Sequence, residues 1–127
     1  MEEEADGLLK YLTQGLEDCS GFPVVAQKED AEDTRFQAGD VAIVEIFSDE
    51  SDDEICMVRQ SEANNSQGKV TLKTLYETLQ TELQANPDYS LMVSEWFKLE
   101  GGFKGRLDMP LRGVEIDTEE EVVRLFF

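Results

Sequence analysis

The chain has 127 residues, and its 29 acidic side chains oppose 11 basic ones, so the formal net charge is −18. A charge of this sign repels nucleic-acid phosphates and anionic lipids, which argues against direct nucleic-acid binding and against a membrane partner. The sequence contains no histidine, which removes histidine-based catalytic triads and histidine-containing zinc sites. Because 40% of the residues are apolar, residues 1–127 are expected to fold as a single domain.

The spacing of apolar residues predicts two helices and several short strands. A leucine stripe predicts a helix over 6–17, with Asp6 as its N-cap, and a longer stripe predicts a second helix over 71–85. The polar segment 61–69 is expected to be a linker between two halves. Strands are expected at 22–26, 41–47, 54–59, 90–99, 111–116 and 121–127, with loops at 28–39 and 100–106. The expected fold class is therefore α+β, with two helices packed on mostly antiparallel strands.

The two halves of the chain read in the same order: helix, strand, loop, strand, acidic turn, strand. Val44-Glu45-Ile46 matches Val114-Glu115-Ile116, and an acidic run follows each. This echo suggests an internal duplication of an α-β-β-β unit, with repeats over 6–60 and 70–127 related by a pseudo-two-fold axis. One repeat alone would have a thin core, so the two are expected to share one.

Acidic side chains gather in three runs, and the first two are the predicted partner-binding residues. Residues 1–60 hold seventeen acidic and four basic side chains, a net of −13, whereas residues 61–127 hold twelve and seven, a net of −5. Carboxylates spaced along loops offer acceptor oxygens to arginine much as phosphates do, so a basic protein partner is expected. The predicted partner-binding residues are Glu29, Asp30, Glu32 and Asp33 in the first loop, and Asp49, Glu50, Asp52, Asp53 and Glu54 around the following turn. The third run is 117–121.

The same acidic residues do not predict a metal site or any other cofactor. The run 49–54 lacks the glycine and the distant glutamate of a calcium loop, and adjacent acids at a hairpin tip point in several directions. No catalytic residue is assigned and no enzyme activity is expected, because neither Ser94 nor Cys19 has a histidine to activate it. Cys19 and Cys56 are expected to be buried and unpaired, as in a cytoplasmic protein.

In charge and length, the chain resembles phage-encoded anti-defence proteins and nuclease-inhibiting immunity proteins. The resemblance implies an inhibitor or nucleic-acid mimic that occupies a basic, nucleic-acid-binding surface on another protein. Two alternatives stay open. An acidic secretion chaperone or adaptor would be indicated by exposed apolar patches and dimerisation, and a small enzyme by a deep pocket containing coupled carboxylates of raised pKa.

Overall fold

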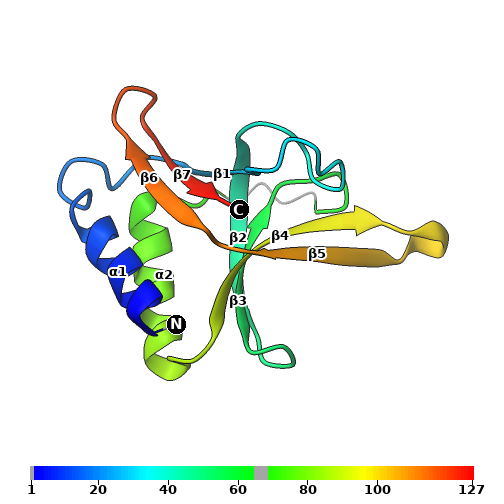
Figure 1. The fold of residues 1–127 in the computed structure, drawn as a ribbon, viewed down its shortest axis with the longest axis horizontal. Helices are drawn as coiled ribbons and strands as arrows, with labels where there is room; N and C mark the ends of the chain where they lie inside the picture. Colours follow the sequence, from blue (N-terminus) through cyan, green and yellow to red (C-terminus); the bar gives the residue numbers. More distant parts are fainter. Residues whose placement is uncertain (1, 65–68) are drawn as a thin grey trace.

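The computed structural model describes residues 2–64 and 69–127, with side chains from Gly7 onward (Figure 1). The described chain forms two α-helices, seven strands and one short 3-10 helix, and it belongs to the α+β class. The elements are α1 (Glu2–Thr13), β1 (Val24–Gln27), β2 (Val41–Asp49), β3 (Glu54–Arg59), α2 (Leu72–Ala85), β4 (Ser90–Lys98), η1 (Glu100–Gly102), β5 (Lys104–Pro110), β6 (Gly113–Asp117) and β7 (Val122–Phe126).

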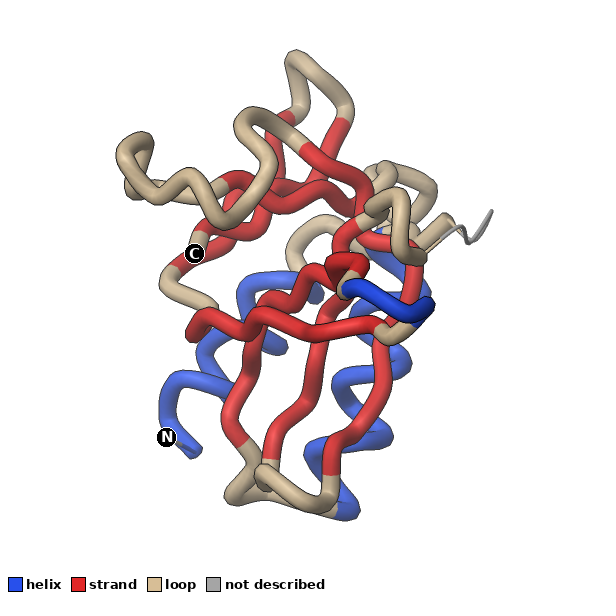
Figure 2. Tube along the Cα trace, turned by 90° about the vertical axis from the view of Figure 1, so that its right-hand side faces the viewer, coloured by secondary structure: helices blue, strands red, loops and turns tan. Residues whose placement is uncertain are grey.

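The two helices pack against each other and bury their leucine stripes against the sheet. Leu72, Leu75, Leu79 and Leu83 of α2 are buried, and the Thr71 side chain accepts a hydrogen bond from the Thr74 N–H at the start of the helix. Helix α1 begins at Glu2, so the expectation that Asp6 is its N-cap was wrong. Figure 2 shows both α-helices behind the curled strands, so one face of the sheet is covered.

All seven strands lie in one mixed sheet, in the order β5-β4-β3-β2-β1-β7-β6. The β3–β4 and β1–β7 pairings are parallel, and the other four are antiparallel. Strands β5 and β6 form opposite edges of the sheet, although only Leu111 and Arg112 separate them. The Leu111 N–H donates to the Leu91 carbonyl in β4 at 3.0 Å, and the Arg112 N–H donates to the Phe126 carbonyl in β7 at 2.8 Å. The sheet therefore curls until its two edges are joined by one stretch of chain.

The strand registers of the two halves coincide. The pair Val25–Ala42 in the first half corresponds to Met92–Pro110 in the second, and Phe47–Cys56 corresponds to Glu115–Arg124. Of the pairs that join the two halves, Val24–Val123 corresponds to Leu91–Ile55. The numbers of strands nevertheless differ, because β5 and β6 together occupy the position of β2. The register of β2 shifts between Ile43 and Glu45, at the place where the other half has its break between β5 and β6. The structure thus does not contain the simple repeat of one helix and three strands that was expected.

Strand β5 was missed by sequence reasoning, which assigned part of it to a loop. Its residues include a glycine and a proline and no β-branched residue, so they give a weak strand signal. The conformation depends instead on pairing with β4, where the Phe97 ring packs over Gly105 so closely that a Cβ there would overlap it. Pro110 ends the strand on the edge of the sheet, where an N–H is not needed.

A single hydrophobic core contains residues from both halves of the chain. Its fully buried members include Leu12, Val24 and Ile43 from the first half, and Leu75 and Leu125 from the second. Cys19 and Cys56 are buried and unpaired, as expected. Neither of the two described α-helices is long and apolar enough to cross a membrane.

Candidate partner-binding site

The acidic turn between β2 and β3 is a rigid loop built around Asp49. One Asp49 carboxylate oxygen accepts hydrogen bonds from the N–H groups of Ser51, at 3.0 Å, and Asp52, at 3.3 Å. Asp53 has a φ of 56°, a left-handed conformation that aspartate tolerates better than most residues. The turn consequently directs the side chains of Glu50, Asp52 and Asp53 into solvent, where all three are exposed.

Asp49 itself is held inside the protein by Arg106 of β5. The Arg106 guanidinium forms a short ion pair with Asp49 and binds Asp108 through its Nε at 2.9 Å, and the Asp52 carboxylate lies 3.7 Å away. Burial opposes the charge of Arg106, but the hydrogen bonds to Asp49 and Asp108 outweigh it and raise the arginine pKa. The Arg106 hydrogen bond also lowers the pKa of Asp49. Sequence reasoning grouped Asp49 with the surface acids, whereas its carboxylate belongs to this internal network.

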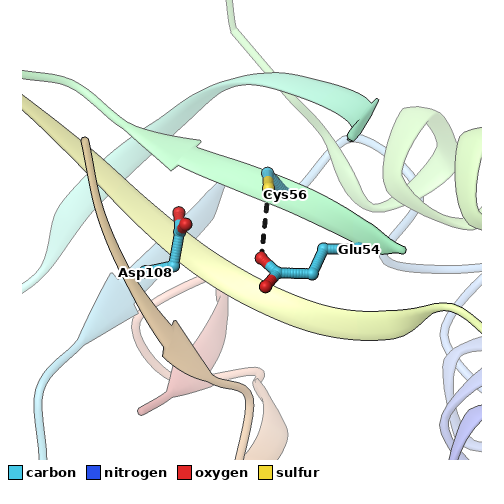
Figure 3. Close-up of side chains that lie close together, drawn as sticks. All are labelled: Glu54, Cys56 and Asp108. Atoms are coloured by element: carbon cyan, nitrogen blue, oxygen red, sulfur yellow. Dashed lines mark hydrogen bonds between the residues drawn. The ribbon is translucent and has the colours of Figure 1, made fainter. Parts of the chain in front are cut away.

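Glu54 also points onto the sheet, where it meets Cys56 and Asp108 (Figure 3). One possible ligand atom from each lies within 4.8 Å of the others, and the Cys56 Sγ is 4.0 Å from a Glu54 oxygen. Burial, with repulsion from Asp108 and Asp52, raises the pKa of Glu54, and burial raises the pKa of the Cys56 thiol to about 11. Three such groups could in principle hold a cation. Here, however, the Arg106 guanidinium already neutralises Asp108, and Ser94 Oγ donates to the same carboxylate at 2.6 Å.

The second predicted group, in the loop between β1 and β2, is organised mainly by contacts within the loop. Asp33 forms two hydrogen bonds to the Arg35 guanidinium, at 3.0 and 2.8 Å, and these lower its pKa to about 2. Asp30 accepts from the Glu32 N–H at 3.0 Å. Glu29 lies 3.9 Å from the Arg112 guanidinium. Glu29, Asp30 and Glu32 are exposed, and Asp33 is partly buried.

The two predicted groups stand at opposite ends of β2 (Figure 1). Strand β2, Val41–Asp49, lies between the two groups and by itself extends over roughly 27 Å, at about 3.4 Å per residue. The structure therefore does not gather them into one compact patch. A partner that contacted both groups would need an extended basic surface.

All five arginines of the chain pair with carboxylates of the chain itself. Arg59 is fully buried, where its Nη1 binds Glu95 at 2.7 Å and its guanidinium lies over the Phe127 ring. Arg124 joins Asp40, Glu115 and Asp117 around the β6–β7 turn. The arginines are thus already engaged, and the net charge is strongly negative, although Lys98 and Lys104 are also exposed on the surface.

Two features of the structure were not foreseen from the sequence. The hairpin of β4 and β5 extends away from the helices as an arm (Figure 1), and its tip exposes Phe97, Leu99 and Phe103. A cavity of about 780 Å³ also opens between α1, the start of β4 and the β5–β6 junction, beside Leu8, Tyr89 and Leu111. No sequence pattern marks a cavity formed by three distant segments.

No protein-family model, curated protein or solved structure matches the chain.

Proposed function

We propose that this protein binds a basic surface of another protein, and that Glu50, Asp52 and Asp53 at the β2–β3 turn make the central contact. One observation carries the proposal. Every arginine is paired within the chain, while these three carboxylates project from a turn whose backbone is fixed by Asp49. A fixed set of carboxylates loses little conformational entropy when arginine side chains bind it.

The spacing of the two acidic groups supports mimicry of a nucleic acid in particular. The nine-residue strand between them is roughly as long as eight base-pair steps of a duplex, at about 3.4 Å each. A basic groove that holds a duplex of that length could contact Asp30 and Glu32 at one end and the β2–β3 turn at the other. The net charge of −18 would also accelerate encounter with such a groove, and this gain would fall as salt screens the field.

The test begins with capture of the partner from a host lysate at low and high salt, followed by titration. The variant carries Glu50→Gln, Asp52→Asn and Asp53→Asn, and it keeps Asp49 because that residue holds the turn together. Affinity for the captured partner should fall by about tenfold, or 1.4 kcal/mol, mainly through slower association. A control variant with Glu119→Gln, Glu120→Gln and Glu121→Gln removes the same charge from the β6–β7 turn. Equal affinities for wild type and both variants, without salt dependence, would reject the proposal.

A second candidate function, an adaptor or secretion chaperone, is favoured by the arm. Phe97, Leu99 and Phe103 are the three large apolar side chains that the described chain exposes most, and all three lie at the arm tip. Such a cluster is typical of a docking surface. Sedimentation over a range of concentrations separates the candidates, because an adaptor of this kind would dimerise and Phe103→Ser would abolish the dimer.

The third alternative, a carboxylate enzyme, gains less support. The described lining of the cavity beside Tyr89 contains no acidic side chain, and Glu54, whose pKa is raised, lies outside that lining.

We also infer that the two halves derive from one α-β-β-β unit. The coincident registers support this, as does the match between the β2 register shift and the β5–β6 break. An experimental structure in which Val25–Ala42 and Met92–Pro110 do not superpose would contradict the inference.

A further inference from the structure

The cavity beside Tyr89 occupies a position that is filled in the other half of the molecule. Its walls include Tyr89, Leu91, Leu111 and Val114, with Gly7 and Leu8 of α1 on the opposite side. Leu91 is the register equivalent of Val24, and Leu111 follows Pro110 as Ile43 follows Ala42. In the other half, the position that corresponds to this cavity therefore lies between Val24 and Ile43.

That equivalent place holds the extended segment 69–71, which leads into α2. The Val24 N–H donates to the Val70 carbonyl at 2.9 Å, and the Val70 N–H donates to the Ile43 carbonyl at 3.3 Å. The Val70 side chain is buried in the core, at 6% exposure, and Lys69 beside it is exposed. One half of the fold thus binds an extended segment in which a buried aliphatic residue stands next to a lysine.

No described segment lies in the corresponding position of the other half, where the cavity is lined instead by residues of α1, β4 and the β5–β6 junction. The cavity beside Leu91 and Leu111 is the corresponding position, and it is open. Its lining is mainly apolar, so an aliphatic side chain entering it would be removed from water.

The cavity also adjoins the acidic turn. The Ser90 N–H donates to the Asp53 carbonyl at 3.0 Å, which fixes the start of β4 against the turn. Burial, together with the nearby charges of Asp53 and Glu50, raises the pKa of the Tyr89 phenol in the cavity wall. Arg112 also lines the cavity, and its guanidinium lies 3.9 Å from Glu29. A cationic group of a ligand is therefore favoured at Tyr89, beside the acidic turn.

We propose that this cavity binds an extended segment of the basic partner protein, with an aliphatic side chain inserted between Leu91 and Leu111 and an adjacent lysine or arginine on the β2–β3 turn. The segment adds to the sheet as Val70 does in the other half, through main-chain hydrogen bonds and one apolar anchor. This inference rests on the proposed function, because the acidic β2–β3 turn supplies the negative charge that binds the lysine or arginine next to the aliphatic side chain.

Two synthetic peptides serve as probes: one alternates arginine with leucine, and the other alternates arginine with alanine. Wild type should bind the leucine peptide about tenfold more tightly, because only leucine fills the cavity. In nuclear magnetic resonance spectra, the leucine peptide should shift the amide signals of Leu91 and Leu111. Equal binding of the two peptides would overturn the inference.

The key variant is Gly7→Leu, which fills the cavity from α1. A Cβ at Gly7 meets no atom within 4 Å, and leucine is the better helix former, so the variant should fold. This variant should bind the two peptides with about equal affinity, and its affinity for the alanine peptide should be the same as that of wild type. The control Gly21→Leu lies outside the cavity, has equally open space and should keep the full preference. A preference that survives Gly7→Leu would overturn the inference.

The outcomes separate this inference from the proposed function. If the alanine peptide binds with salt dependence and the leucine peptide binds no more tightly, the proposal for the acidic turn is supported and the inference about the cavity is wrong. If neither peptide nor captured partner binds, both are wrong. If instead wild type dimerises and Gly7→Leu abolishes the dimer, the occupant is a second copy of the chain, which also overturns the inference.

Discussion

The β2–β3 and β6–β7 turns are built alike but stand in different surroundings. In each turn an aspartate carboxylate accepts from the N–H groups two and three residues later, and the last turn residue has a positive φ, 56° at Asp53 and 57° at Glu121. An arginine from another strand then binds that aspartate: Arg106 of β5 binds Asp49 in one turn, and Arg124 of β7 binds Asp117 in the other. Similar local sequences thus give the same loop.

The two turns differ in the exposure of the carboxylates that surround their arginines. Arg106 at the first turn contacts Asp49 and Asp108, whose side chains are only 16% and 19% exposed. Arg124 at the second turn contacts Asp40 and Glu115, which are 35% and 50% exposed. The polar network under the first turn is therefore less exposed than the one at the second turn, although Asp52 is 58% exposed and Asp117 only 18%. Their acidic composition alone does not separate a binding turn from a solvated turn.

The largest expected difference comes from removing the two arginines. Arg106→Gln leaves Asp49, Asp108 and Glu54 close together and only partly exposed, so we expect a loss of about 2 kcal/mol in the free energy of unfolding. Arg124→Gln leaves carboxylates that solvent can reach, so the loss should be about 1 kcal/mol. Urea unfolding measures both. Equal losses would show that the two networks are equally solvated and would remove the distinction between the turns.

The aspartates at the base of each turn give the next effect and a dependence on pH. The pKa of Asp49 is lowered by its Arg106 hydrogen bond, and that of Asp117 by its backbone hydrogen bond to Glu120 and then by Arg124. A lowered pKa stabilises the fold above the unfolded value of about 4, and this stabilisation disappears as pH falls through the folded value. Asp49→Asn and Asp117→Asn should each lower Tm by a few degrees at neutral pH, and the difference from wild type should shrink steadily below pH of about 4. A difference that does not change with pH would contradict the ionic origin.

The smallest effect concerns the residue that follows each turn, Glu54 in one and Val122 in the other. Burial and the neighbouring Asp108 and Asp52 raise the pKa of Glu54, so its folded form binds a proton more tightly than the unfolded chain does. The charged form therefore destabilises the fold as pH rises above about 4.3. Glu54→Gln should raise Tm by about one or two degrees at neutral pH and leave it unchanged at low pH. A lowered Tm at neutral pH would mean that Glu54 makes a stabilising contact.

The sequence predicted the elements whose signal is local. Leucine spacing indicated both helices, and β-branched residues followed by an acidic turn indicated strands β2 and β3. It missed β5, because Gly105 and Pro110 form a strand only when β4 lies beside them. It also grouped Asp49 with Asp52 and Asp53, since nothing in the run distinguishes a carboxylate that will meet Arg106, far along the chain. The cavity could not be predicted from the sequence either, because its walls come from three separate segments of the chain.

Competition with nucleic acid tests the central claim most directly. A labelled duplex is first bound to the basic partner captured from the lysate, and its fluorescence anisotropy is followed as this protein is added. Wild type should displace the duplex completely, and the variant with Glu50→Gln, Asp52→Asn and Asp53→Asn should require about tenfold more protein, whereas the β6–β7 control should match wild type. Formation of a complex that retains the duplex, or equal displacement by both variants, would contradict the claim that the β2–β3 turn takes the place of phosphates.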